Sequence, residues 1–319
     1  MKPGAMAGLR VRCLVEESGT AGAAPLVESF GGDDVRLFVL AGLVRFILVL
    51  GEEFGERLAG AIGDVRRRSG VGETQRLWEP AGAVEQSLGF LGHLGLLEMV
   101  DELGFFLAEE FYWFNPSKLP SPIEWVNKRK LRAKDSVNTV WWFSKTEWPK
   151  ADVTKVLAPY SDRMKKLMED PDKYYTPKVR PSGHDIGKGF AKDNGGAIPS
   201  NLLQIPNSES NGQYLSGCKA IGLKGHPARF PAKLPEFFIR MLTDPDDLVV
   251  DIFGGSNTTG QVAEAEGRRW MAFEALPEYV AASSFRFLDK GASPGLIQVL
   301  YDKIVAGKSV SIDVYRQKQ

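Results

Sequence analysis

Residues 247–274 read DLVVDIFGGSNTTGQVAEAEGRRWMAFE, and this stretch decides the fold. Its apolar start, 248–253, predicts a buried parallel strand. Gly254 and Gly255 follow, where the chain must turn sharply and where the absence of a Cβ lets a ligand approach the backbone. Capping residues then open a short helix that ends at Gly267. Strand, glycine turn and helix in this order predict a nucleotide-type cofactor pocket.

A second strand and an acid complete this unit. The apolar run 270–273 closes on Glu274, which lies 23 positions after Asp251. At that spacing a carboxylate at the tip of the second strand can accept hydrogen bonds from ribose hydroxyls. The glycines do not follow G-x-G-x-x-G, and no Lys-Ser/Thr pair follows them, which argues against a dinucleotide fold and a Walker loop. A strand-turn-helix without a ligand remains the alternative.

A proline-rich segment precedes this unit and reads HPARFPAKLPEFF over 226–238. Apolar side chains recur at helical spacing from Leu234 to Met241, which predicts a helix that runs into the first strand. Such a helix would bring the loop 226–231 beside the glycine turn. The alternative is a plain amphipathic helix with a proline-rich lead-in.

Together these segments resemble the cofactor half of bacterial amino-methyltransferases that act on DNA, in the class whose cofactor segment comes last. The resemblance rests on D-x-F-x-G-S-x-T-T from Asp251 and on H-P-A-x-F-P-x-K-L-P-E from His226. It implies an S-adenosylmethionine site in which Asp251 shapes the turn and faces the methionine end, and Glu274 holds the ribose. The implied cofactor-binding residues are Pro227, Ala228, Asp251, Phe253, Gly254, Gly255, Ser256, Asn257, Thr258 and Glu274.

Two further stretches resemble the cytosine-N(4) branch of this family, YWFNPSKLPSP over 112–122 and PSNLL with PNSESN over 199–211. The resemblance covers roughly 91–290. It implies a Rossmann-like α/β methyltransferase sheet with helices on both faces and an inserted target-recognition region. It also implies methylation of cytosine N4 in a specific duplex sequence, within a restriction-modification system that includes a cognate endonuclease. Adenine-N6 methylation is the nearest alternative, and a small-molecule or RNA methyltransferase is a more distant one.

The middle of the chain independently indicates a nucleic-acid partner. Residues 126–192 hold 16 Lys/Arg against 8 Asp/Glu, in a chain of net charge zero. Cations neutralise phosphates, and the neighbouring Trp141, Trp142 and Trp148 are candidates for stacking on a base. A solvated basic face with tryptophans in the core is the alternative. The segment 155–181 is predicted to be mostly loop. The candidate DNA-binding residues are Lys128, Arg129, Lys130, Arg132, Lys178 and Arg180.

No catalytic residue can be assigned. Enzymes of this type carry Ser/Asp/Asn-Pro-Pro-aromatic, whose polar side chain and proline carbonyl hold the target amine while the ring stacks on a flipped base. The sequence contains no Pro-Pro pair. A catalytically inactive DNA- or cofactor-binding remnant therefore stays open as an alternative.

Composition divides the chain unevenly. Residues 1–114 contain no Asn, a single Lys and a single Tyr, so 1–90 is predicted to be an atypical or truncated part, and one that packs poorly. An unrelated domain, a fused linker or translation of a GC-rich gene in the wrong frame would explain it, and we favour the last. The expected parts are 1–90, the end of a catalytic subdomain at 91–125, the target-recognition insertion at 126–225, the cofactor segment at 226–290 and an extension at 291–319.

The remaining features suggest an ordinary intracellular protein. The apolar run 35–50 contains two arginines and is too short for a membrane span, so it is predicted to be a buried helix or strand. No export segment is recognised, which makes the cytoplasm the default location. Cys13, Cys218 and three scattered histidines indicate neither a disulfide framework nor a metal site. Residues 297–314 alternate weakly and are predicted to form a strand pair.

Overall fold

A computed structural model describes residues 10–11, 36–40, 45–50, 96–174, 181, 191–208 and 212–316, the first three ranges by their backbone alone. Lys178 and Arg180 lie outside the described residues. The strands are β1 (Arg10–Val11), β2 (Arg36–Leu40), β3 (Arg45–Leu50), β4 (Phe106–Phe114), β5 (Val137–Ser144), β6 (Leu202–Gln204), β7 (Leu248–Asp251), β8 (Arg269–Ala272) and β9 (Val310–Ser311). The helices of eight or more residues are α5 (Asp162–Glu169), α7 (Gln213–Ala220), α8 (Lys233–Leu242), α9 (Thr258–Ala265) and α11 (Pro294–Val305). The shorter ones are η3 (Glu98–Glu102), η4 (Glu124–Lys128), η5 (Val153–Val156), α6 (Pro171–Tyr174), α10 (Pro277–Ser283), η7 (Ser284–Phe287) and η8 (Ile312–Tyr315).

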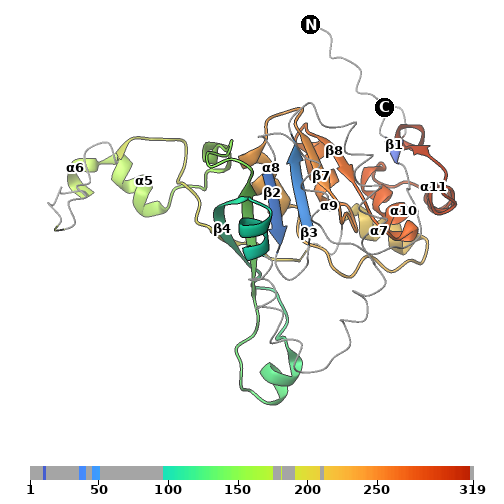
Figure 1. The fold of residues 1–319 in the computed structure, drawn as a ribbon, viewed down its shortest axis with the longest axis horizontal. Coiled ribbons are helices and arrows are strands. Elements are labelled where there is room, and N and C mark those ends of the chain that lie inside the picture. The colour runs from blue at the N-terminus through green and yellow to red at the C-terminus, as the bar shows by residue number, and fades with distance from the viewer. Residues whose placement is uncertain are drawn as a thin grey trace, which may run out of the picture.

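Seven described strands form one sheet in the order β6-β4-β5-β2-β3-β7-β8 (Figure 1). The pairs β4–β6 and β7–β8 are parallel, and every other neighbouring pair is antiparallel. Strands β4, β6, β7 and β8 therefore point the same way and end at one edge of the sheet, which we call the carboxyl edge. In open α/β sheets this is the edge where ligands bind. The opposite edge is called the amino edge.

Helix α8 covers one face of the sheet because its apolar side chains share one side of the helix. Phe238 packs edge-to-face on Phe111 of β4 at 5.1 Å between ring centroids. Trp113 and Trp142 join the same buried cluster from β4 and β5. Burying each such ring stabilises the fold by roughly 1.5–3 kcal/mol. The predicted helix over the 234–241 stripe is confirmed.

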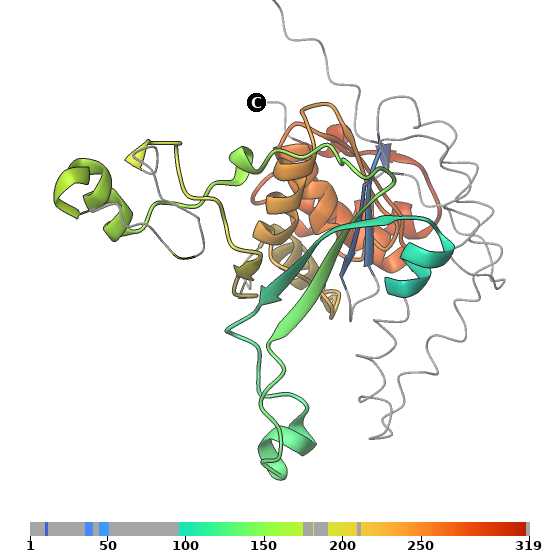
Figure 2. The same ribbon diagram turned by 60° about the vertical axis from the view of Figure 1, so that its left-hand side comes forward.

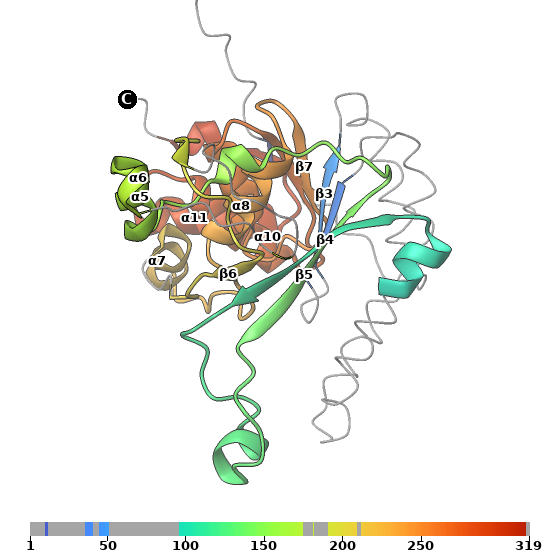
Figure 3. The same cartoon turned by 90° about the vertical axis from the view of Figure 1, so that its left-hand side faces the viewer.

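The other face of the sheet carries η3, which lies on the side away from α8 and α10 (Figures 2 and 3). Phe105 and Phe143 meet edge-to-face there at 6.3 Å. Trp141 also points to this face and is 4% exposed. Trp141 and Trp142 are thus buried in the sheet, and the expectation that they stack on a nucleic-acid base is wrong, whereas Trp148 is 86% exposed.

A second core unites α7, α10, η7 and α11 beyond β8. Leu300 and Ile304 of α11 are fully buried in it beside Phe285. The predicted strand pair over 297–314 is wrong, because Ser293 caps a helix that begins at Pro294, a residue suited to a first turn. Only the short strand β9 lies within that range.

The insertion after β5 is more helical than expected. Residues 155–174 include α5 and α6, and the Ser161 side chain caps α5 by accepting from the Met164 N–H at 3.2 Å. The arm 157–201 leaves the sheet near the amino edge, because β5 ends there and β6 begins there. Its helices α5 and α6 lie to one side of the sheet, away from β7 and β8 (Figure 1). Within the described part of the chain, no helix is both long and apolar enough to cross a membrane.

The apolar run 35–50 was predicted to form a helix or a strand. It forms the two strands β2 and β3. β2 pairs with β5, and β3 pairs with β7, so this hairpin occupies the middle of the sheet. Strand pairing does not test the packing of the side chains of 36–40 and 45–50, so their poor packing stays a prediction. The rest of 1–90, apart from the two residues of β1, lies outside the described residues.

Candidate cofactor site

The glycine turn at the carboxyl edge is organised by Asp251, the last residue of β7. Its side chain is buried at 1% exposure. One carboxylate oxygen accepts from the Phe253 N–H at 3.0 Å, and the other accepts from the Thr259 hydroxyl at 2.7 Å. Asp251 thereby ties the turn to the first turn of α9. The predicted turn-shaping role has a structural basis, and its contact with a methionine end stays a prediction.

The local geometry favours glycine at both positions of the turn. Gly255 has φ +54°, a conformation that favours glycine. At Gly254 an added Cβ would come within 3.2 Å of the Ala272 Cβ and 3.3 Å of the Phe273 carbonyl oxygen. The Gly254 N–H donates to that same carbonyl at 2.7 Å, which holds the turn against the strand β8.

Glu274 faces the turn, as the spacing predicts. One of its carboxylate oxygens accepts from the Gly255 N–H at 2.9 Å, and the other accepts from the Leu276 N–H at 3.2 Å. A carboxylate oxygen can accept a second hydrogen bond. The half-buried Glu274 is therefore held beside the turn by these two N–H groups. The ribose contact itself stays a prediction.

The turn passes into α9 through Asn257. This residue adopts φ 54° and ψ 45°, and its side chain caps the helix by accepting from the Gly260 N–H at 3.0 Å. Ser256 and Thr258 are buried on either side of it, whereas Phe253 is 45% exposed at the rim. Asn257 is thus committed to capping, and Phe253 is the loop residue that presents an apolar ring outward.

Arg286 of η7 holds the glycine turn in place through hydrogen bonds. Its role was not predicted from the sequence. Its guanidinium donates to the Ser256 backbone carbonyl, to the Ser256 hydroxyl at 3.1 Å and to the Thr258 hydroxyl at 3.0 Å. It also lies over the ring of Tyr214 of α7, 4.9 Å from the ring centroid. Ser256 and Thr258, predicted as polar contacts for a ligand, are therefore bound to Arg286.

Tyr214 connects the proline-rich segment to this support. Its hydroxyl accepts from the His226 N–H at 2.8 Å, and the His226 ring meets Tyr279 of α10 at 4.5 Å. Burial raises the pKa of Tyr214 to about 12, although the bond from His226 opposes the rise. The loop 226–231 is thus joined through Tyr214 and Arg286 to the glycine turn, as predicted. Pro227 is exposed there.

A second connection reaches from this loop to β4. The Asn115 side-chain oxygen accepts from the Ser117 N–H and from the Asn207 N–H, both at 3.1 Å. The Asn207 amide donates to the Arg229 carbonyl at 2.8 Å. The motifs over 112–122 and 199–211 therefore meet at the carboxyl edge, the same edge at which β7 ends. We call the residues 115–136, which join β4 to β5, the finger.

The finger carries four of the candidate DNA-binding residues, and they are not equivalent. Glu124 binds both Lys128 and Arg129 at 3.0 Å, and Arg129 also lies over the Trp125 ring. Hydrogen bonds from Arg129 and then Lys128 hold the pKa of Glu124 below its usual value. Within the described residues, the side chains of Lys130 and Arg132 make no hydrogen bond or ion pair, and both residues are exposed.

The acid-tipped turn lies at the carboxyl edge of a mixed α/β sheet, and a finger rich in Lys and Arg leaves the sheet at the same edge. Residues 65–285 match the N6_N4_Mtase family model, described as DNA methylase. The chain belongs to this family. The predicted family and its α/β methyltransferase fold are confirmed, and the match begins before residue 91.

Three known proteins illustrate the likeness. Type II methyltransferase M.PvuII of Proteus hauseri is 76% identical over 218 residues, which are 68% of this chain and 65% of that protein. DNA adenine methyltransferase YhdJ of Escherichia coli (strain K12) is 40% identical over 83 residues, or 26% of each. The solved PvuII DNA methyltransferase (cytosine-N4-specific) superposes with a TM-score of 0.55 at 61% identity, covering 69% of this chain and 64% of that one. This chain therefore spans less than two thirds of the length of M.PvuII.

Proposed function

We propose that this chain is an S-adenosylmethionine-dependent DNA methyltransferase that modifies the exocyclic N4 amine of cytosine in a specific duplex sequence. The observation that carries the proposal is the glycine turn, where the Glu274 carboxylate at the end of the second strand is held against the Gly255 N–H. The 76% identity to M.PvuII and the name of the matching solved structure support cytosine over adenine.

The residues present fit an adenosyl ligand. Gly254 and Gly255 leave the turn without side chains, so a ligand can lie against the backbone. Glu274 can accept from ribose hydroxyls, and the exposed Phe253 ring can cover an apolar part of the ligand. When bound, S-adenosylmethionine supplies an electrophilic methyl group on a sulfonium. The turn and Glu274 would orient it, and Asp251 would keep the turn in shape.

Duplex DNA would lie along the carboxyl edge, which carries both the finger and the cofactor turn. A cognate restriction endonuclease that recognises the same sequence is part of the proposal, because restriction-modification pairs the two activities. The missing Pro-Pro pair favours a second candidate function, a protein that binds the cofactor and DNA without transferring the methyl group.

Calorimetry with S-adenosylmethionine tests the cofactor site. We expect Glu274→Gln to weaken binding about tenfold, which corresponds to about 1.4 kcal/mol. Glu278→Gln is the matched control, because this exposed acid lies four residues further on in α10. Equal affinities for both variants and the unmodified chain would contradict the proposed site.

Transfer of a tritiated methyl group to mixed-sequence duplex DNA tests the reaction. The proposal requires label in N4-methylcytosine after hydrolysis of the DNA. Label in N6-methyladenine would shift the assignment to adenine. Cofactor and DNA binding without incorporation would instead identify the binding-only protein.

A further inference from the structure

The tip of the finger, residues 130–132, is a tight turn that follows η4. Lys130 has φ 55°, which turns the chain back at the end of η4. The Leu131 and Arg132 N–H groups both return to the Trp125 carbonyl, at 2.9 and 3.3 Å. This closed turn places the sequence Lys-Leu-Arg directly after η4, within the finger that projects from the carboxyl edge (Figure 1).

The charges of the finger are mostly compensated within it, except at this tip. The finger holds six Lys/Arg and two Asp/Glu. Lys118 binds Asp135 at 3.0 Å, and Lys134 donates to two backbone carbonyls at 3.2 Å. Lys128 and Arg129 share Glu124. Among the described contacts, only Lys130 and Arg132 of these cations are without a protein partner, so they are available to an external anion.

Leu131 lies between these two cations and is 69% exposed. Two other large apolar side chains of the finger, Leu119 and Ile123, are also exposed, at 80% and 62%. However, Leu119 follows the ion-paired Lys118, and Ile123 precedes Glu124. An apolar group flanked on both sides by uncompensated positive charge is therefore found in the finger only at Leu131.

The base of the finger is held to the cofactor side of the sheet. Asn115 begins the finger and is bonded to Asn207, which is bonded to the loop 226–231. That loop is joined to the glycine turn through Tyr214 and Arg286. The tip is thus attached to the methyl-donor site through a continuous series of contacts.

We propose that Lys130-Leu131-Arg132 is a wedge that opens duplex DNA. The two cations bind phosphates, and Leu131 enters a groove and unstacks a base step, as apolar side chains of several DNA-bending proteins do. This inference rests on the proposed function, because it requires duplex DNA as the partner. It adds the residues that disturb the stack so that a cytosine can leave it.

The test uses the full chain and a mixed-sequence duplex that contains 2-aminopurine, whose fluorescence rises when it is unstacked. The unmodified chain should raise the fluorescence. Leu131→Ala should lose most of this rise while the dependence of DNA affinity on salt stays the same. Leu119→Ala is the matched control, because it shortens another exposed leucine of the same finger and should leave the rise intact.

The cations are tested by the slope of log affinity against log salt concentration. Lys130→Gln and Arg132→Gln should each lower the slope by about 1. Lys128→Gln should lower it by less than half as much, since Glu124 already compensates that charge. The affinity for S-adenosylmethionine reports that each variant is folded, because the tip does not contact the cofactor turn.

Two results would overturn the wedge while leaving DNA binding in place. One is an undiminished fluorescence rise with Leu131→Ala, and the other is an equal loss with Leu119→Ala. Absence of DNA binding by the unmodified chain would instead overturn the proposed function, and the wedge with it.

Discussion

Arg286 illustrates how a residue outside a motif can determine the shape of that motif. Its planar fork binds a carbonyl and two hydroxyls of the glycine turn from a position 30 residues further along the chain. These groups are buried, so their hydrogen bonds cannot be replaced by water without opening the turn. The guanidinium is thus a positioning group for the cofactor site.

We predict that Arg286→Met destabilises the chain by about 2–3 kcal/mol, because the buried hydroxyls of Ser256 and Thr258 lose their donor. The affinity for S-adenosylmethionine should fall as the turn loosens. Arg286→Lys should recover only part of both losses, since an ammonium lacks the fork geometry. Urea unfolding and calorimetry measure the two effects. An unchanged urea midpoint for Arg286→Met would show that the turn holds its shape by itself.

For single residues, the sequence predicted the positions whose role depends on residues close by in the chain. Asp251, Gly254, Gly255 and Glu274 were identified because a strand, a tight turn and a following strand constrain residues close in the chain. The contacts of Arg286 and Tyr214 were missed, because tertiary packing sets them and no local pattern marks either residue. Lys128 and Lys130 look alike in the sequence, and only the position of Glu124 distinguishes them.

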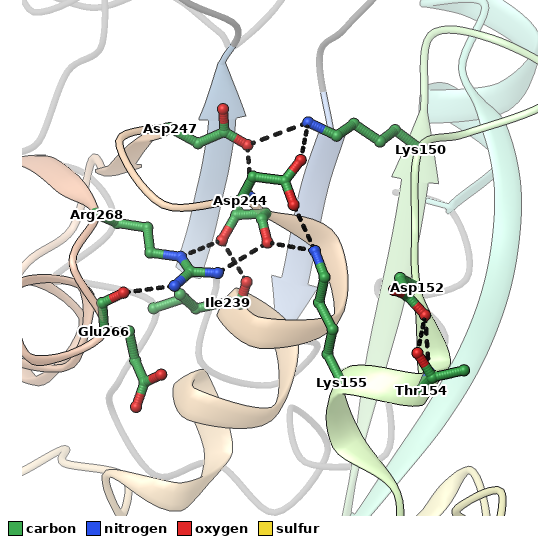
Figure 4. A network of polar contacts seen from close by, with 10 residues as sticks. Lys150, Asp152, Thr154, Lys155, Ile239, Asp244, Asp247, Glu266 and Arg268 are labelled. Atoms are coloured by element: carbon green, nitrogen blue, oxygen red, sulfur yellow. Dashed lines mark hydrogen bonds and ion pairs between the residues drawn. The ribbon is translucent and has the colours of Figure 1, made fainter. Parts of the chain in front are cut away.

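Among the elements, a set of ion pairs fixes the root of the insertion (Figure 4). Asp244, in the turn between α8 and β7, accepts from Lys150 at 2.6 Å and from Lys155 at 2.5 Å. Asp247 binds the same Lys150 at 3.6 Å and caps the Asp244 N–H at 2.9 Å. Arg268 holds the neighbouring Thr243 carbonyl at 2.8 Å. These contacts join the start of the arm 157–201 to the strand that carries the cofactor turn.

We predict that Asp244→Asn lowers the free energy of unfolding at neutral pH by about 0.5–1 kcal/mol, a small value because these side chains are largely solvent-exposed. Hydrogen bonds from Lys150 and then Lys155 hold the pKa of Asp244 well below its usual value of 3.8. A depressed folded-state pKa stabilises the fold above the unfolded-state pKa and loses this contribution as the pH falls below it. The difference between variant and parent should therefore be constant near neutral pH and shrink below about pH 4.

Urea unfolding at several pH values measures this difference. Asp246→Asn is the control, because Asn tolerates the φ of 69° at that position. A difference for Asp244→Asn that persists unchanged below the unfolded-state pKa would contradict the ion-pair explanation.

Helices and strands were predicted well where the apolar period was regular. The helix that contains Leu234 and Met241 is one example. The helices α5 and α11 were missed, because α5 is polar and short, and α11 is apolar on more than one side. Their capping residues, Ser161 and Ser293, were the available signals.

At the scale of the whole molecule, amino-acid composition fails to predict the place of the amino-terminal hairpin in the sheet. Composition separates 1–90 from the rest, yet β2 and β3 stand between β5 and β7 in the sheet. Composition reports which residues a segment uses, whereas strand pairing depends on backbone groups that every residue carries. The origin of the segment stays a prediction, and its contribution to stability can be measured.

We predict that Leu48→Pro destabilises the chain by about 3 kcal/mol or more relative to Leu48→Ala. Leu48 pairs with Leu37 on one side and Val250 on the other, and proline removes an N–H from a central strand. The alanine variant keeps the N–H and controls for the lost side chain. Thermal unfolding compares the two. Equal stabilities would mean that the hairpin does not belong to the cooperative unit.

Strand direction also decides where a designer could graft the absent tetrapeptide. β3 runs against β7, so the last residue of β3, Leu50, lies at the amino edge. β2 runs with β7 and ends at Leu40 on the cofactor side, two strands away, or about 10 Å. Ser-Pro-Pro-Tyr inserted after Leu40 would emerge at the edge that carries the glycine turn, whereas the same insertion after Leu50 would emerge at the opposite edge of the sheet.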